Sequence, residues 1–197
     1  MPPLEDIFRN LAGAWRMMNG KSDGLRAFDI SADGFWASFF AIPVALPALL
    51  LGWVAIANDL GQEPAVFGSR PSIIIRLALV DLGAWVLPLA AFAVAARPAG
   101  LSHRFAHYVI AGNWGAALLI WAMLPTSLLR LTVGENALGD TFTLVVFMLT
   151  LVLSWRLTNV AIGKGPAVAS AVFSAMLLLS LAVLFGLQSL LGLGPEG

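Results

Sequence analysis

The 197-residue sequence contains no cysteine, and only 11% of its residues are charged. The absence of cysteine excludes disulfides, thiolate nucleophiles and cysteine-ligated metals. Soluble domains carry roughly 25% charged residues, so the low charge argues against a water-soluble globule. Eleven basic and eleven acidic residues cancel, which leaves no net field to attract nucleic acid. The chain is rich instead in apolar residues, at 59% of the total, with a mean hydropathy of +0.88.

Five apolar stretches are long enough to cross a bilayer, which takes about 20 residues because the hydrocarbon core is roughly 30 Å thick. They run over Phe35–Ala57, Ser72–Ala96, Phe105–Leu129, Thr141–Ile162 and Ala167–Leu191. The connections between them are short and polar, which predicts that consecutive helices are antiparallel neighbours in one bundle. Asp140 is placed to cap the fourth helix, and Pro166 suits the first turn of the fifth.

The fold class predicted is therefore all-α, a polytopic membrane helical bundle with five transmembrane helices. We expect a cytoplasmic N-terminal segment over residues 1–34, a transmembrane domain over 35–192 and a short tail outside the cytoplasm over 193–197. Eight basic residues fall on the side of the N-terminus: Arg9, Arg16, Lys21, Arg26, Arg97, Arg104, Arg156 and Lys164. The loops on the other side hold two, Arg70 and Arg130. The positive-inside rule thus predicts a cytoplasmic N-terminus and an external C-terminus, as in a bacterial inner-membrane protein.

The N-terminal segment has the periodicity of an amphipathic helix. Its apolar positions are Leu4, Ile7, Phe8, Leu11, Ala12, Trp15 and Met18. The helix is too polar to cross the bilayer, and it can lie along the cytoplasmic face of the membrane as an interfacial anchor packed on the bundle. The alternative is a docking surface for a cytoplasmic protein, formed by Phe8, Leu11 and Trp15.

Asp81 is the main candidate for a functional residue within the membrane. It lies near the middle of the second span, where an aspartate costs on the order of 2.5–3.5 kcal/mol to insert. Arg76, five positions away, is not on the same helical face, and its long side chain can reach the outer end of the helix. One hypothesis makes Asp81 a proton or cation site. The other makes it a protonated or hydrogen-bonded packing residue, satisfied by a neighbour such as Asn113 or a serine of the fifth span.

Other motifs indicate no chemistry. His103 and His107 share a helical face, but no third ligand stands nearby, so we expect no bound metal. No sequence motif for a catalytic nucleophile, a metalloprotease or a nucleotide site is present, and we expect neither catalytic residues nor a cofactor. Small residues repeat in the fifth span at Ala167, Ser170, Ala171, Ser174 and Ala175. Such a face supports close helix packing, within the fold or in a homo-oligomer.

The pattern as a whole resembles the bacterial branch of the Yip family, which are small membrane proteins with five spans and a cytoplasmic N-terminus. The resemblance rests on the span count, the orientation, the chain length and the block LRAFDISADGFWASFFAIPVALP at residues 25–47. It implies a non-enzymatic membrane protein that acts through association with a membrane or cytoplasmic protein, as a scaffold, assembly or trafficking component. The alternative is a small oligomeric transporter or channel that uses Asp81. The partners expected are the lipid bilayer and such a protein, and no nucleic acid.

Overall fold

The computed structural model describes residues 2–61, 69–134 and 136–193, and no strand occurs within them. The elements are α1 (Leu4–Met18), η1 (Ser22–Ala27), α2 (Ala32–Ala37), η2 (Ser38–Phe40), α3 (Ala41–Leu60), α4 (Arg70–Ala96), α5 (Ser102–Val133), α6 (Ala137–Ile162) and α7 (Pro166–Leu190). Five helical segments are long and apolar enough to span a membrane, the first being the continuous stretch Ala32–Leu60. The five-helix membrane bundle is therefore confirmed, and the chain is an integral membrane protein.

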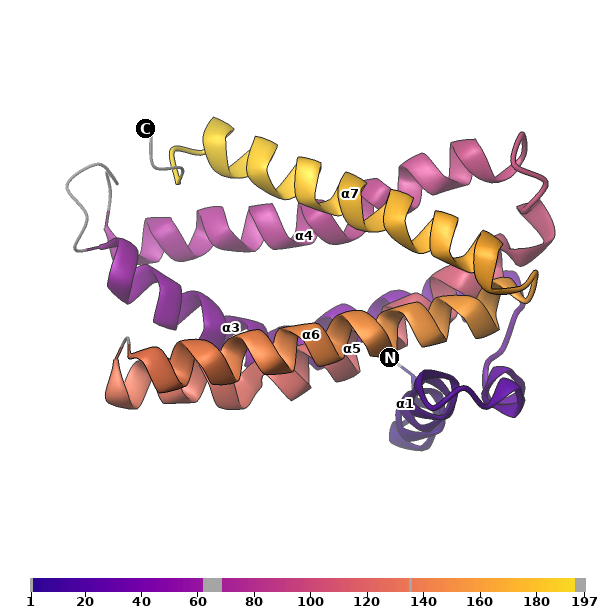
Figure 1. The fold of residues 1–197 in the computed structure, drawn as a ribbon, viewed down its shortest axis with the longest axis horizontal. Helices are drawn as coiled ribbons and strands as arrows, with labels where there is room; N and C mark the ends of the chain where they lie inside the picture. The colour runs from indigo at the N-terminus through magenta and orange to yellow at the C-terminus, as the bar shows by residue number, and fades with distance from the viewer. Residues whose placement is uncertain (1, 62–68, 135, 194–197) are drawn as a thin grey trace.

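The five spans form two layers (Figure 1). The helices α4 and α7 lie side by side in one layer, and α3, α5 and α6 make up the other. The most extensive contacts are α3 with α5, α5 with α6, and α4 with α7. Consecutive spans are in contact throughout, as predicted, and α4 packs more extensively on α7 than on either of its neighbours in sequence. The layers are joined by fewer contacts, those of α3 with α4, α6 with α7 and α4 with α5.

Glycines permit the closest helix approaches. A Cβ at Gly83 would lie 2.4 Å from a methyl carbon of Leu187, so α4 and α7 are in contact at the glycine surface. A Cβ at Gly115 would lie 2.5 Å from Leu157 and 3.1 Å from Met18, which brings α5, α6 and α1 together. Without a hydrophobic force between helices in lipid, such close van der Waals packing drives association.

The amphipathic helix is confirmed as α1, and it packs on α5 and α6 at one end of the bundle (Figure 1). Its inner side contributes Met17 and Met18, both fully buried. A Cβ on Gly24 of η1 would lie 2.5 Å from the carbonyl oxygen of Gly13, so the backbones of α1 and η1 touch directly. The segment is therefore a folded unit attached to the bundle.

Two helix-start predictions had different outcomes. Pro166 is the first residue of α7, as expected. Asp140 does not cap α6, because the cap is Asn136, whose Oδ1 accepts from the Gly139 N–H at 2.9 Å. Asp140 lies in the first turn instead, where a carboxylate still complements the helix dipole.

The central helix α5 has 32 residues. At about 1.5 Å per residue it is on the order of 48 Å long, well beyond a hydrocarbon core of roughly 30 Å. It contacts α3, α4, α6 and α1, so it is the element shared by both layers and the N-terminal unit. Its extra turns project beyond the core or are accommodated by tilt.

Candidate functional site

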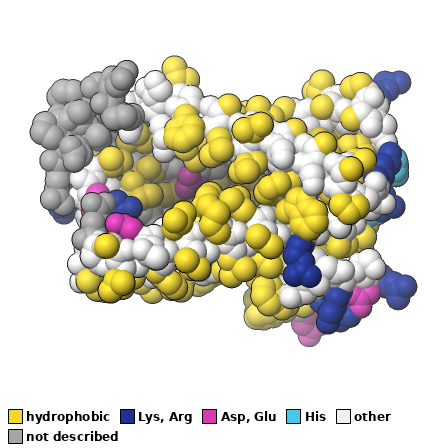
Figure 2. All heavy atoms as spheres, in the orientation of Figure 1, with side chains coloured by type: hydrophobic (Ala, Val, Ile, Leu, Met, Phe, Trp, Pro, Cys, Tyr) yellow, Lys and Arg dark blue, Asp and Glu magenta, His cyan; other side chains and the backbone are white. Residues whose placement is uncertain are grey.

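A cleft lies between the two layers, and it has two adjoining parts. The larger, of about 500 Å³, is lined by α4, α5, α6 and α7 together with Met18. The smaller, of about 390 Å³, is lined by α3, α4, α5 and α6. Leu119, Ile120 and Phe147 border both parts. Figure 2 shows the hollow between the layers with apolar side chains around it, so the site is an apolar cleft with few polar groups.

Asp81 lines the smaller part of the cleft. Its Oδ2 accepts a hydrogen bond from the indole N–H of Trp53 on α3 at 2.6 Å. The described parts of the chain offer Asp81 no other hydrogen-bond donor. The hypothesis that Asn113 or a serine of α7 satisfies this carboxylate is therefore wrong, because the partner is a tryptophan on the preceding span. A hydrogen bond to an indole offsets part of the cost of a carboxyl group in the membrane.

Asn113 belongs to a separate buried network. Its side chain is 1% exposed, and its Nδ2 donates to the hydroxyl of Ser38 at 2.9 Å. Its Oδ1 accepts from the indole N–H of Trp85 at 3.0 Å, while the Ser38 hydroxyl donates to the carbonyl of Phe35 at 2.7 Å. The amide therefore connects the first span, α4 and α5, and it acts as an interhelical tie.

Arg76 does not meet Asp81. One of its terminal nitrogens donates to the carbonyl of Leu191 at 3.3 Å, where α7 ends. The side chain thus reaches toward the end of the helix, as the spacing predicts, and it ties α4 to α7. The three intramembrane candidates are therefore not assembled into one polar site.

Tryptophan N–H groups recur as links between helices, a role that the sequence analysis missed. Besides Trp53 and Trp85, Trp121 donates to the carbonyl of Val44 at 2.9 Å. Trp155 donates to the hydroxyl of Ser170 at 3.0 Å, which joins α6 to α7. An indole is largely apolar with a single donor, so it can pack in the membrane while satisfying one acceptor on a neighbouring helix.

The two histidines lie in the first turns of α5. The Nδ1 of His107 is buried and has no hydrogen-bond partner. Within residues 2–61, 69–134 and 136–193 no three histidine or acidic side chains gather in a way that could hold a metal ion.

The predicted docking residues of α1 separate into two groups. Phe8 and Trp15 are 67% and 54% exposed, and Leu4 beside them is also exposed. Leu11 is partly buried and packs against the main apolar core. The apolar arc of α1 is therefore wider than its contact with the bundle, and the uncovered part, which we call the α1 strip, consists of Leu4, Phe8 and Trp15.

Polar contacts fix the end of the bundle that carries α1. Arg156 of α6 donates to the carbonyl of Asn19 at 3.1 Å, just after α1 ends. Arg16 forms an ion pair with Asp23 of η1, and this hydrogen-bonded guanidinium holds the pKa of the Asp23 carboxyl below its ordinary value. The Ser31 N–H lowers the pKa of Asp29 in the same way. Figure 2 shows most of the basic side chains on this view gathered at that end.

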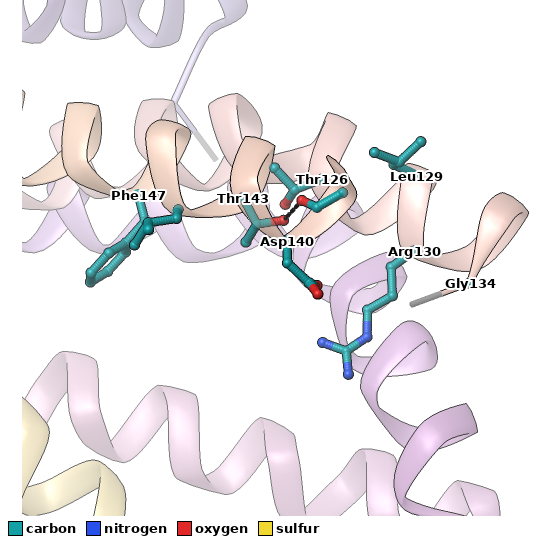
Figure 3. Close-up of a pocket in the computed structure, with 9 residues that line it drawn as sticks. Thr126, Leu129, Arg130, Gly134, Asp140, Thr143 and Phe147 are labelled. Carbon is teal, nitrogen blue, oxygen red and sulfur yellow. Dashed lines mark hydrogen bonds between the residues drawn. The ribbon is translucent and has the colours of Figure 1, made fainter. Parts of the chain in front are cut away.

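A small pocket of about 270 Å³ lies at the opposite end, where α5 is followed by α6 (Figure 3). Arg130 and Asp140 extend toward it from the two helices. Arg130 also pairs with Asp59, which joins the ends of α5 and α3. The Thr143 hydroxyl donates back to the Gly139 carbonyl at 2.9 Å. Exposed ion pairs of this kind contribute little to stability, at most about 1 kcal/mol.

The small residues of α7 lie mostly on the exposed side of this helix. Ala167, Ser170, Ala171, Ser174 and Ala175 are all exposed. The buried residues of α7 are Ala169 and Val172. Ser170 accepts the indole N–H of Trp155 on α6, so one member of the stripe serves packing within the fold, while the other four lie on the exposed side of α7. The α4–α7 contact uses Gly83 instead.

No protein-family model, curated protein or solved structure matches this chain. These comparisons neither support nor contradict the resemblance to the Yip family. The local geometry offers two sites, the cleft with Asp81 and the α1 strip.

Proposed function

We propose that this membrane protein has no enzymatic activity and acts as a scaffold, assembly or trafficking component by binding another protein. We further propose that it resides in a bacterial inner membrane with its N-terminus in the cytoplasm, as the distribution of basic residues favours. The Yip-like pattern agrees with this role.

The observation that carries the proposal is the α1 strip. The strip belongs to a helix that is held in place by buried methionines, a glycine contact and Arg156. Large aromatic side chains on an immobilised helix give contact area at low entropic cost, which is typical of the anchor residues of interfaces. Neither Phe8 nor Trp15 is needed to bury the core of the described chain, since both are more than half exposed.

The test is the double variant Phe8→Ser/Trp15→Ser in the full-length protein. Extraction in a mild detergent after chemical cross-linking in the cell should recover one defined protein with the wild type. The double variant should lose that protein, because the strip supplies its contact. Leu138→Ser is the matched control, since Leu138 is an exposed apolar residue at the far end of the bundle, and it should retain the partner.

Hydrogen exchange of α1 in the double variant is the folding control, and protection equal to that of the wild type is expected. A wild-type protein that is always recovered as a solitary monomer contradicts the proposal. Retention of the partner by the double variant would reduce the strip to an interfacial anchor, with the aromatic rings at the depth of the lipid headgroups.

The second candidate function is a small oligomeric transporter or channel that uses Asp81. The location of Asp81 on the wall of the cleft favours it. Asp81→Asn keeps an oxygen for the Trp53 hydrogen bond but removes the titratable group, so proton-linked flux into reconstituted vesicles should be lost. Asp140→Asn, in the first turn of α6 and outside the cleft lining, should leave the flux unchanged. Absence of any flux with the wild type excludes this function.

A further inference from the structure

The cleft lies at the depth of lipid acyl chains. Its lining residues come from the middle turns of the spans, such as Pro88 in α4, Ala116 in α5, Leu151 in α6 and Met176 in α7. These turns lie within the hydrocarbon region of a bilayer about 30 Å thick. Figure 2 shows that the hollow reaches the molecular surface on the face where α6 and α7 lie in front, so it is open sideways.

The wall on the α5 side is set back by small residues. Gly112 lines the cleft, and a Cβ added to it would meet nothing within 4 Å. Ala116 lies one turn further along the same wall. This lack of side chains leaves a continuous space against α5, bounded by Trp85 on α4 and by Phe173 and Met176 on α7.

The volume decides which kind of occupant fits. The parts of the cleft measure about 500 and 390 Å³, which lies in the range of about 300–1,000 Å³ typical of sites for small ligands. A single hydrocarbon chain is slender enough to lie along the wall of α5.

The chemistry of the lining favours the same occupant. Water in a buried site needs two to four polar partners. The walls of the larger part are mainly apolar, and its polar lining residues are Tyr108, Asn113, Ser154, Thr158 and Ser180. The amide of Asn113 is already bonded to Trp85 and Ser38, and Asp81 lines only the smaller part. An empty apolar space loses the dispersion contacts of its walls. In a bilayer, the material available to restore those contacts is the surrounding hydrocarbon.

We propose that the cleft between the layers binds one acyl chain of a bilayer phospholipid. The chain lies along α5, from Gly112 towards Phe147 of α6. The site is specific to the chain rather than to the headgroup, and it retains its lipid more strongly than the outer surface of the bundle does. This inference does not depend on the proposed protein partner, because the α1 strip and the cleft are different surfaces.

Native mass spectrometry of the protein purified in detergent tests the site. The wild type should retain about one phospholipid per chain after washing that strips the surface lipids. Gly112→Phe places a ring in the open space and should lower the retained lipid severalfold. Gly186→Phe is the matched control, since a Cβ there also meets nothing within 4 Å but Gly186 is on the exposed side of α7 outside the cleft lining. It should retain lipid as the wild type does.

Fluorescence quenching in reconstituted vesicles locates the chain. The vesicles contain phosphatidylcholine brominated in the middle of the acyl chains, and single-tryptophan variants keep Trp85, Trp121 or Trp114. Trp85 lines the cleft and should be quenched nearly as strongly as Trp121, which lies well inside α5 and is 42% exposed. Trp114 is 1% exposed and should be unaffected. Gly112→Phe, added to the Trp85 variant, should relieve the quenching.

Three results would overturn the proposal. The first is wild-type protein without retained phospholipid and with Trp85 unquenched by the brominated chains. The second is quenching of Trp85 by a water-soluble quencher such as acrylamide, which means that water fills the cleft. The third is cross-linking of a photoreactive residue at position 112 to another protein rather than to lipid.

Discussion

At the residue scale, Asp81 and Asn113 each accept a hydrogen bond from a tryptophan on a neighbouring helix. Sequence reasoning found Asp81 and Asn113, because polar residues inside apolar spans are conspicuous. It did not find their partners, Trp53 and Trp85, because hydropathy does not define how each helix is rotated about its axis. One signal was available for the second pair. Trp85 and Asn113 each lie eleven residues from the ends of α4 and α5 that face the same connection, so they are at the same depth.

The Asn113 network can be tested by a double-mutant cycle. Asn113→Ala removes the acceptor of Trp85 and the donor to Ser38, and Trp85→Phe removes the indole N–H together with part of the ring. The two changes share one hydrogen bond, so we expect a coupling energy of about 0.6 kcal/mol, with about 1.7 kcal/mol as the upper bound seen for such bonds in membranes. Unfolding in detergent at increasing denaturant measures it. A coupling energy of zero would mean that the bond contributes nothing to stability.

Asp23 and Arg16 offer a test by pH. The carboxylate has a lowered pKa in the folded protein, so the ion pair contributes above the ordinary pKa of aspartate and is lost as the pH falls through the lowered value. Arg16→Gln should therefore raise the pKa of Asp23, measured by NMR titration. Lys21→Gln is the control, because Lys21 lies nearby without this hydrogen bond and should change the pKa less. An Asp23 pKa unchanged by Arg16→Gln would contradict the contact.

At the scale of the element, α1 shows what periodicity can and cannot predict. The spacing of apolar residues identified the helix and its bounds, since an amphipathic pattern depends on local sequence. The division of its apolar side into a buried part and an exposed strip was not predictable. That division depends on where the helix sits on α5 and α6, and on the contact between Gly13 and Gly24.

Gly24→Ala should release α1 from η1. The new Cβ would lie 2.5 Å from a backbone oxygen, so the two segments must separate, and overpacking of this kind costs typically about 1–3 kcal/mol. Hydrogen exchange should show faster opening of α1 while the five spans remain protected. Gly112→Ala is the control, because its Cβ meets nothing. Equal protection of α1 in the two variants would show that the glycine contact is dispensable.

At the scale of the whole molecule, the number of spans was predictable and their arrangement was not. Length and hydropathy identify each span independently of the others. The pairing of α4 with α7 joins segments about a hundred residues apart, and it depends on shape, as at Gly83 against Leu187. The cleft follows from this pairing, so its position could not be predicted from hydropathy or spacing.

An odd number of crossings requires that the chain ends lie on opposite faces of the membrane. Fusion of a reporter to each terminus should therefore give activity in the cytoplasm for the N-terminal fusion and outside it for the C-terminal one. The clustering of basic residues at the α1 end predicts this direction. Both reporters on the same face would contradict the five-span topology, and the reverse assignment would contradict only the orientation.

Met18 connects the N-terminal helix α1 to the cleft that we propose binds an acyl chain. This side chain belongs to α1, yet it forms part of the end wall of the cleft and touches α5 near Gly115. Any displacement of the helix by a bound protein would withdraw a thioether from contact with the resident hydrocarbon. Thermodynamic reciprocity then requires that the lipid alter the affinity for the protein by the same factor. The affinity for the proposed protein partner would then depend on the lipid composition of the membrane.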